Sequence, residues 1–419
     1  MKKLAILFCF FFFLLSPAES QFAQHHYGNL SNKYYYSFEG QSQFFSNSVS
    51  TKVLRSFYGN NYIDNDIKES VDYSKPIYGM NEINGGFQFI WLPDSAKFQA
   101  GIYASVGTRH IRSGYISPAF YELIMFGNKR FAGETANLSD SRMFLCDYQK
   151  LSLGITVRLP SDSSLSFASI HISPVKGQRY IETETAATSF YTSETGEMLS
   201  LQAQAIYYSS DQNKRRNQDF AGIGLAMGAM LYIYNSDHNF WIYASITDIG
   251  HINWKHKSSR TYIDTTLNFN GIYVDNVFSI DSSLFNISSD TLNRIIEEYT
   301  DTMHIRRSLP ETFYLEAGKL FPAYNLSISG SLQYVSRTGM PWPRLQIATE
   351  WNKHKYFMPS IILGIGGSGR FAGGLGLNSN LLPNLMVSIT TPDILSFLIP
   401  EHSYANGVWL RIRYNFSKV

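Results

Sequence analysis

Apolar and polar residues alternate along several stretches of this chain, each roughly ten positions long. In 325–334, leucine, isoleucine and tyrosine alternate with asparagine, serine and glutamine, and the same period of two recurs in 151–159, 199–207 and 408–416. In 221–233 glycine supplies much of the polar face, which would let another group lie close to that side. A period of two is typical of β-strands with one apolar and one polar face. Its repetition over so much of the chain predicts an all-β fold.

The apolar runs of the chain are too short for membrane-spanning helices. After residue 15 none reaches the length of about 20 residues that a helix needs to cross a bilayer. Alternating strands can still cross if they close into a barrel, because closure pairs every backbone polar group. We therefore expect a transmembrane antiparallel up-and-down β-barrel of about 14–16 strands. The alternation favours roughly 16 strands starting near residue 46, with about 14 as the alternative.

Connection lengths give the expected barrel an orientation. Short turns such as 321–324 and 352–355 alternate with longer connections, and barrels of this type have short turns on the periplasmic side. The longest connection, 249–309, is then an external insertion. We expect short helices in the external loops, one within 119–126 and an amphipathic one within 290–299.

The first residues are typical of an exported protein. In 1–20, two lysines precede an uninterrupted apolar run and then small residues, which is the pattern of a cleaved secretory signal peptide. With the predicted barrel, this signal indicates export through the inner membrane to the cell outer membrane. The segment 21–45 is a candidate plug, and 46–419 is the expected barrel domain.

Composition supports a membrane environment and excludes some partners. Only 16% of the residues are charged while 15% are aromatic, and a soluble domain would have roughly a quarter charged. Outer-membrane lipid is therefore the expected surroundings of the barrel. The net charge of +2 gives no reason to expect a nucleic-acid partner.

Four charged residues occupy the polar face of predicted strands and are candidates for the lumen. They are Arg158, Glu350, Arg411 and Arg413. An arginine at mid-bilayer on the lipid face would cost about 2–4 kcal/mol, so the inward register is preferred. Two interpretations remain open, namely a plug of internal salt bridges and a charged constriction that selects a solute.

No pattern in the sequence indicates catalysis, a cofactor or a metal. His251 and His256 stand in the predicted external insertion without a cysteine or carboxylate at metal-ligand spacing. Asp248 is interpreted as part of a turn that ends a strand, and Ser368 as part of a glycine-rich turn. The chain is therefore not expected to be an enzyme.

Several local blocks carry a resemblance to a known family. They are the residues 125–133, 246–254, 309–310 and 393–398. Over residues 85–416 the chain resembles a family of Bacteroidota outer-membrane barrels of unknown function. That family is related to fatty-acid transporter-like barrels and to barrel components of type IX secretion. The resemblance implies a barrel of about 14 strands and brings no catalytic residues.

Two functions follow from these observations and stay open at this point. The first is a scaffold or partner component of an envelope or secretion assembly, which would dock an envelope protein through 249–309. The alternative is a fatty-acid transporter-like channel for a hydrophobic or small amphipathic solute. An apolar pocket open to the mouth or to a lateral gap would favour the channel. A lumen filled by side chains would oppose it.

Overall fold

The computed structural model describes residues 34–58, 63–92, 100–159, 166–210, 221–235, 239–255, 257–269, 298–382 and 384–416. The predicted signal peptide, residues 1–20, lies outside these ranges. So does the predicted helix in 290–299, apart from its last two residues.

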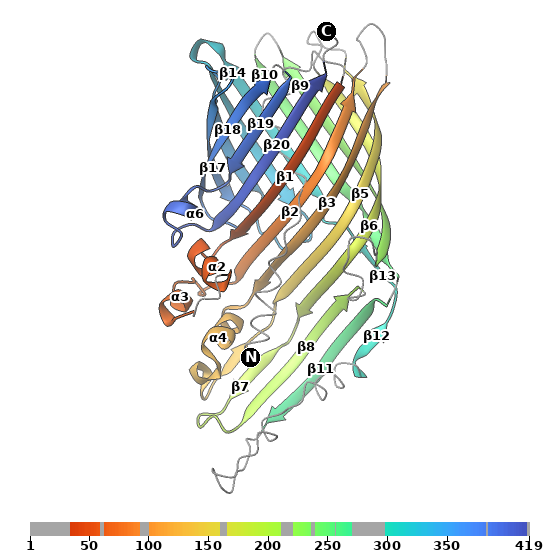
Figure 1. Ribbon diagram of the computed structural model, residues 1–419. Helices are drawn as coiled ribbons and strands as arrows, with labels where there is room; N and C mark the ends of the chain where they lie inside the picture. Colours follow the sequence, from red (N-terminus) through yellow and green to blue (C-terminus); the bar gives the residue numbers. More distant parts are fainter. Residues whose placement is uncertain are drawn as a thin grey trace.

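Fourteen antiparallel strands form a closed barrel in the described part of the chain (Figure 1). Consecutive barrel strands pair with each other, and the last strand returns to the first to close the ring. The barrel strands are β1 (Tyr34–Ser46), β2 (Ile77–Trp91), β3 (Ala100–Ile116), β5 (Arg142–Arg158), β6 (Phe167–Thr185), β9 (Gly222–Asn235), β10 (Phe240–Trp254), β14 (Thr312–Phe321), β15 (Leu326–Val335), β16 (Arg344–Trp351), β17 (Met358–Gly366), β18 (Ala372–Leu382), β19 (Leu385–Thr391) and β20 (Ala405–Phe416).

The remaining elements lie mostly at the end of the barrel opposite the C-terminus (Figure 1). The further strands are β4 (Thr135–Asn137), β7 (Ser189–Thr192), β8 (Leu199–Ser209), β11 (Ser259–Phe269), β12 (Thr300–Thr302) and β13 (Ile305–Ser308). The helices are α2 (Thr51–Tyr58), α3 (Asn65–Glu69), α4 (Pro118–Phe126) and α6 (Leu395–Leu398), with 3-10 turns η2 (Asn128–Phe131) and η5 (Pro322–Tyr324).

A sheet extension projects from the barrel wall and consists of β4, β7, β8, β11 and β12 (Figure 1). Strand β6 connects it to the barrel. Its residues Phe167–Gly177 pair with the barrel strand β9, whereas Ile181–Thr185 pair with β8 of the extension. Because β6 changes neighbour along its length, the extension continues the wall of the barrel on one side.

The strands carry apolar residues on their outer face and polar residues on their inner face. In β5, Leu151, Leu153 and Ile155 are 47%, 56% and 58% exposed, whereas Ser152 and Thr156, which alternate with them, are 1% and 0% exposed. A water-soluble barrel would have the opposite arrangement, and a bilayer is the surrounding that such an outer face fits. Further exposed apolar residues of barrel strands are Ile170, Ile172, Ile223, Leu225, Met227, Ile347, Ile361, Leu363, Ile365 and Ile389.

Helices of membrane-spanning length and apolar character are not found among the described residues.

The barrel has the smaller of the two strand numbers expected, and it begins earlier than expected. The segment 34–45, part of the candidate plug, is instead β1, which pairs with β2 on one side and β20 on the other. The alternating stretch 199–207 is strand β8, which belongs to the sheet extension. Alternation recognised the strand correctly but could not distinguish membrane strands from strands beyond the membrane, because both have a period of two.

Part of the connection predicted over 249–309 is strand. Strand β10 continues to Trp254, so the insertion expected over 249–309 begins inside the barrel wall. The short helix expected within 119–126 is confirmed as α4. Its first turn is capped by Ser117, whose hydroxyl accepts a hydrogen bond from the backbone N–H of Phe120, and Pro118 fits the first helical position.

Candidate functional site

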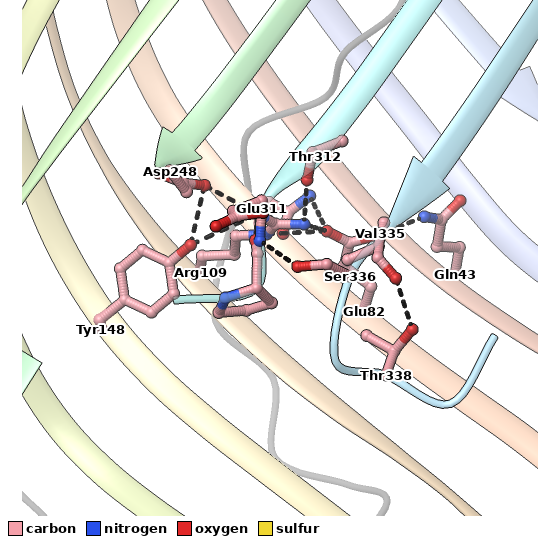
Figure 2. Close-up of polar contacts among 12 residues, drawn as sticks. Gln43, Glu82, Arg109, Tyr148, Asp248, Glu311, Thr312, Val335, Ser336 and Thr338 are labelled. Atoms are coloured by element: carbon pink, nitrogen blue, oxygen red, sulfur yellow. Dashed lines mark hydrogen bonds and ion pairs between the residues drawn. The ribbon is translucent and has the colours of Figure 1, made fainter. Parts of the chain in front are cut away.

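Arg109 lies at the centre of a charged network inside the barrel (Figure 2). Its guanidinium donates from Nε to Glu82 Oε1 at 2.9 Å and from Nη1 to Asp248 Oδ2 at 2.7 Å. It also donates to the carbonyl oxygen of Pro310 at 3.0 Å and to Thr312 Oγ1 at 2.7 Å. The side-chain partners come from β2, β10 and β14, and Pro310 lies just before β14, so one buried side chain on β3 connects distant parts of the barrel wall.

Asp248 is the second centre of the network. Besides Arg109, its carboxylate accepts hydrogen bonds from the Tyr148 hydroxyl at 2.8 Å and from Lys150 Nζ at 2.9 Å. Asp248 is 3% exposed. A buried carboxylate of this kind is stable only with such a complete set of donors, because an unpaired charge in the interior costs several kcal/mol.

A β-bulge in β10 turns Asp248 inward. The pairing of β10 with β9 shifts between Ile246 and Ile249, and Asp248 has a φ of 63°. The extra residue lets Thr247 and Asp248 both face the interior, where they are buried. The interpretation of Asp248 as a strand-ending turn was therefore wrong, since the strand continues through it to Trp254.

Glu82 extends the network to the strands at the barrel seam. Its carboxylate accepts hydrogen bonds from Gln43 Nε2 at 2.8 Å and from Asn84 Nδ2 at 3.0 Å. The amide oxygen of Gln43 in turn accepts a hydrogen bond from Arg344 at 3.4 Å. Positive and negative side chains are thus interleaved across the interior, and Arg109, Asp248 and Glu82 are each held by partners from more than one strand.

Packed apolar residues lie on both sides of this network. Along β10, Trp241 and Tyr243 come before Asp248, and Ile252 and Trp254 come after it. The turn-side cluster consists of Tyr35, Ile90, Leu92, Tyr103, Phe167, Met230, Tyr232, Trp241, Tyr243 and Tyr314. The extension-side cluster consists of Met80, Ile111, Phe144, Cys146, Tyr148, Val175, Tyr180, Ala221, Ala226, Ile252, Trp254, Ile305, Leu309, Val335 and Met340.

The four residues expected in the lumen occupy interior positions of their strands. Arg411 Nε lies 2.7 Å from Glu39 Oε1, and the guanidinium of Arg413 stacks on the ring of Tyr35 at 5.0 Å. Glu350 accepts a hydrogen bond from Asn378 and is buried. Arg158 is the last residue of β5, and it is half-buried.

The network around Arg109 was not recognised in the sequence. The alternation was recognised only from residue 151 onward in β5, which begins at Arg142, and β3, which continues to Ile116, was not among the recognised stretches. The signal that could have revealed the network is a charged residue on the inward face of each strand, Arg109 in β3 and Lys150 in β5. Following the alternation to the true strand ends would have found both.

The glycine-rich inner face expected in 221–233 is filled by the protein's own side chains. A Cβ atom on Gly228 would lie 2.5 Å from His171 Nε2, so the imidazole of β6 packs directly against the bare backbone of β9. His171 is 3% exposed. The small residues therefore accommodate a packed interior side chain at this position.

Among the described residues, no group of three or more His, Cys, Asp or Glu side chains is arranged to hold a metal ion.

The fold and the apolar outer face define the class of the protein, a closed transmembrane β-barrel of the outer-membrane type. The chain belongs to the family of unknown function DUF5723, whose sequence profile matches residues 28–388. A comparison with curated proteins finds no match.

Solved structures of outer-membrane barrels are similar to this chain in fold. A mutant of the monoaromatic hydrocarbon channel TodX has a TM-score of 0.44 at 7% identity, with 92% of this chain and 91% of that chain covered. The Pseudomonas putida toluene transporter TodX has a TM-score of 0.41 at 7% identity, with 94% and 93% covered. The translocator domain of the autotransporter NalP from Neisseria meningitidis has a TM-score of 0.34 at 7% identity, with 93% and 90% covered.

Proposed function

We propose that this protein is an outer-membrane barrel with a closed interior that serves as a scaffold of an envelope or secretion assembly. The observation that carries this proposal is the network around Arg109 and Asp248, which crosses the interior between two packed clusters. A pore for solutes needs a continuous path of polar or apolar space along its axis. Side chains tied to several strands at once oppose such a path.

The apolar outer face of the barrel supports a location in the outer membrane. The outer face of the barrel strands is apolar and exposed, and the candidate signal peptide would direct export. With short turns facing the periplasm, the sheet extension would project outside the cell (Figure 1).

The sheet extension supplies the surface for a partner protein. On β11, Tyr262, Leu267 and Phe269 are 38%, 45% and 42% exposed. One edge of β11 pairs with β8 along the whole strand. On the other edge, among the described residues, only Ser259–Thr261 pair with a strand, which is β12. An edge strand with exposed apolar side chains is a surface on which another protein can add a strand. The partner would be an envelope protein.

A conductance measurement tests the closed interior. The purified full-length protein in a planar bilayer is expected to show no steady current. The Arg109→Ala/Asp248→Ala variant, which lacks the contact across the interior, is expected to show transient currents. A steady current through the unmodified protein would contradict the proposal and favour a channel, and so would uptake of a small hydrophobic solute by vesicles that contain it.

Site-specific photocrosslinking in the native membrane tests the scaffold. A photoreactive residue at Leu267 on the extension is expected to trap one discrete protein, and the same residue at Ile155 on the lipid-facing surface is the control. Equal adducts at both positions, or none at Leu267, would overturn the assignment of the extension as a docking surface.

A further inference from the structure

A charged cavity lies where the barrel wall meets the sheet extension, outside the network around Arg109. Its volume is about 440 Å³. This size falls within the range of about 300–1,000 Å³ that is usual for small-molecule sites. We call it the arginine cavity, and its lining residues are Arg142, Glu182, Glu184, Ile206, Tyr208, Arg306, Arg307, Ser308 and Arg337.

The lining of the arginine cavity has an excess of positive charge. Four arginines face two glutamates. Glu182 is shared by two of the arginines, with Arg142 Nη2 at 2.6 Å and Arg307 Nε at 3.1 Å from its carboxylate oxygens. The pairing of these three residues therefore leaves one positive charge in excess before the other two arginines are considered.

The hydrogen-bond partners of the other two arginines are an imidazole and a backbone carbonyl group. Arg306 Nη2 lies 3.3 Å from His251 Nδ1, and Arg337 Nη1 donates to the carbonyl oxygen of Ser308 at 3.1 Å. Neither forms an ion pair with a carboxylate among the described residues. Each guanidinium has five N–H donors, so both retain donors that can point at a ligand.

The backbone of Arg337, at the edge of the cavity, has a strained conformation. Arg337 has a φ of 65°, in the left-handed region that a side chain with a Cβ atom rarely adopts. The turn is fixed by Thr338, whose hydroxyl donates to the carbonyl oxygen of Val335 at 2.9 Å. A strained non-glycine residue at the rim of a cavity is a feature that clusters at ligand sites.

The cavity also offers an aromatic face. The guanidinium carbon of Arg307 lies 4.2 Å from the ring centroid of Tyr208, so the ring and the guanidinium stack and fix each other. Tyr208 and Ile206 stand on β8, opposite the arginines of β13 in the lining. On the neighbouring strand their cross-strand partners are Glu182 and Glu184, so the cavity combines an aromatic ring with both carboxylates and N–H donors.

We propose that the arginine cavity binds a phosphorylated saccharide at the external end of the barrel. Guanidinium forks of Arg306 and Arg337 match the oxygens of a phosphate in bidentate geometry. The ring of Tyr208 packs against the apolar face of the sugar. The site is independent of the scaffold role, because its residues belong neither to the edge of β11 nor to the interior network.

Titration calorimetry on the full-length protein in detergent tests this site, with glucose 1-phosphate as the probe and glucose as the uncharged control. We expect glucose 1-phosphate to bind and glucose not to bind. The Arg306→Gln/Arg337→Gln variant is expected to weaken binding by at least about tenfold, since it removes the charge-assisted hydrogen bonds to the phosphate. The matched control Arg370→Gln removes an exposed arginine outside the cavity and is expected to leave binding unchanged.

A second measurement distinguishes the source of the sugar phosphate. Nanodiscs of lipopolysaccharide, intact or enzymatically dephosphorylated, present the same chemistry as a lipid headgroup. Binding to intact nanodiscs that is lost on dephosphorylation would assign the ligand to the membrane, and binding of soluble glucose 1-phosphate alone would assign it to a free solute. Either result supports the cavity if the double arginine variant abolishes it. Equal binding of glucose, unchanged affinity in that variant, or no binding of either probe would overturn the proposal.

Discussion

Arg109 and Asp248 stand 139 residues apart in the sequence, yet Nη1 of the first lies 2.7 Å from Oδ2 of the second inside the barrel (Figure 2). Their strands, β3 and β10, are separated around the wall by β5, β6 and β9. The contact therefore spans the interior and does not connect neighbouring strands. It fixes the distance between two parts of the wall that share no backbone hydrogen bonds.

Removing one partner of this contact is expected to destabilise the barrel strongly. Arg109→Leu leaves Glu82 and Asp248 as buried carboxylates with fewer donors, and the expected loss is about 3–5 kcal/mol in the free energy of unfolding. Urea unfolding in phospholipid vesicles, followed by tryptophan fluorescence, measures it. The Arg109→Leu/Asp248→Leu variant is the control and should be more stable than the sum of the two single changes predicts. Strictly additive losses would show that the two residues do not interact.

Alternation predicts interior positions well where a strand has no bulge. It placed Arg411 and Arg413 on the polar face of β20, whose pairing with β1 and β19 has no register shift. The same rule fails at Asp248, because the bulge changes the inward positions of β10 from odd to even numbers. A bulge is specified by the pairing of β10 with its neighbours, which the local pattern of one strand does not contain.

The prediction of the number of barrel strands was inaccurate for a different reason. Strand β8 alternates as regularly as a membrane strand, but its residues are half-exposed on both faces because it belongs to the extension. Strand β1 was assigned to the candidate plug 21–45, and the three consecutive tyrosines at its start mask the alternation. In both cases the missing information is the pairing partner, which lies far away in the sequence.

We expect that Gly318 in β14 must remain a glycine, because Trp241 packs directly against it. A Cβ atom at Gly318 would lie 2.1 Å from Cζ2 of Trp241. Gly318→Ala should therefore lower the free energy of unfolding by about 1–3 kcal/mol, which urea unfolding measures. In the Trp241→Leu background the same change should have little effect, because its three closest contacts are all atoms of that tryptophan. An equal loss in both backgrounds would place the cause in the backbone of β14.

The seam between the first and last strands is expected to depend on one ion pair. Glu39 and Arg411 are direct cross-strand partners in β1 and β20, with 2.7 Å between Oε1 and Nε. Glu39→Arg opposes two positive charges in the interior and should lower the free energy of unfolding by about 3 kcal/mol. The temperature at which the folded band is lost on gel electrophoresis measures it. The swapped variant Glu39→Arg/Arg411→Glu should recover most of the stability. Failure to recover would show that the surrounding residues, and not the pair, determine the effect.

The contact between α3 and η2 outside the barrel is expected to loosen in acid. A hydrogen bond from Arg130, joined by one from the Tyr73 hydroxyl at 2.8 Å, lowers the pKa of Glu69 below its ordinary value of 4.5. Since the folded-state pKa is lowered, the contact is fully present above pH 4.5 and is lost as the pH falls through the lower, folded-state value. Glu122 lies 3.7 Å from the same guanidinium.

Spin labels on the variant Asp66→Cys/Lys129→Cys measure this loosening as a distance distribution. The distribution should be narrow at neutral pH and broaden in acid, since protonated Glu69 no longer holds Arg130. The variant with Glu69→Gln added should be broad at every pH. Part of the contact is expected to persist, because the guanidinium carbon of Arg130 lies 3.4 Å from the ring centroid of Phe126 and that stacking does not titrate. Identical distributions in acid and at neutral pH would show that the stacking alone holds the two elements together.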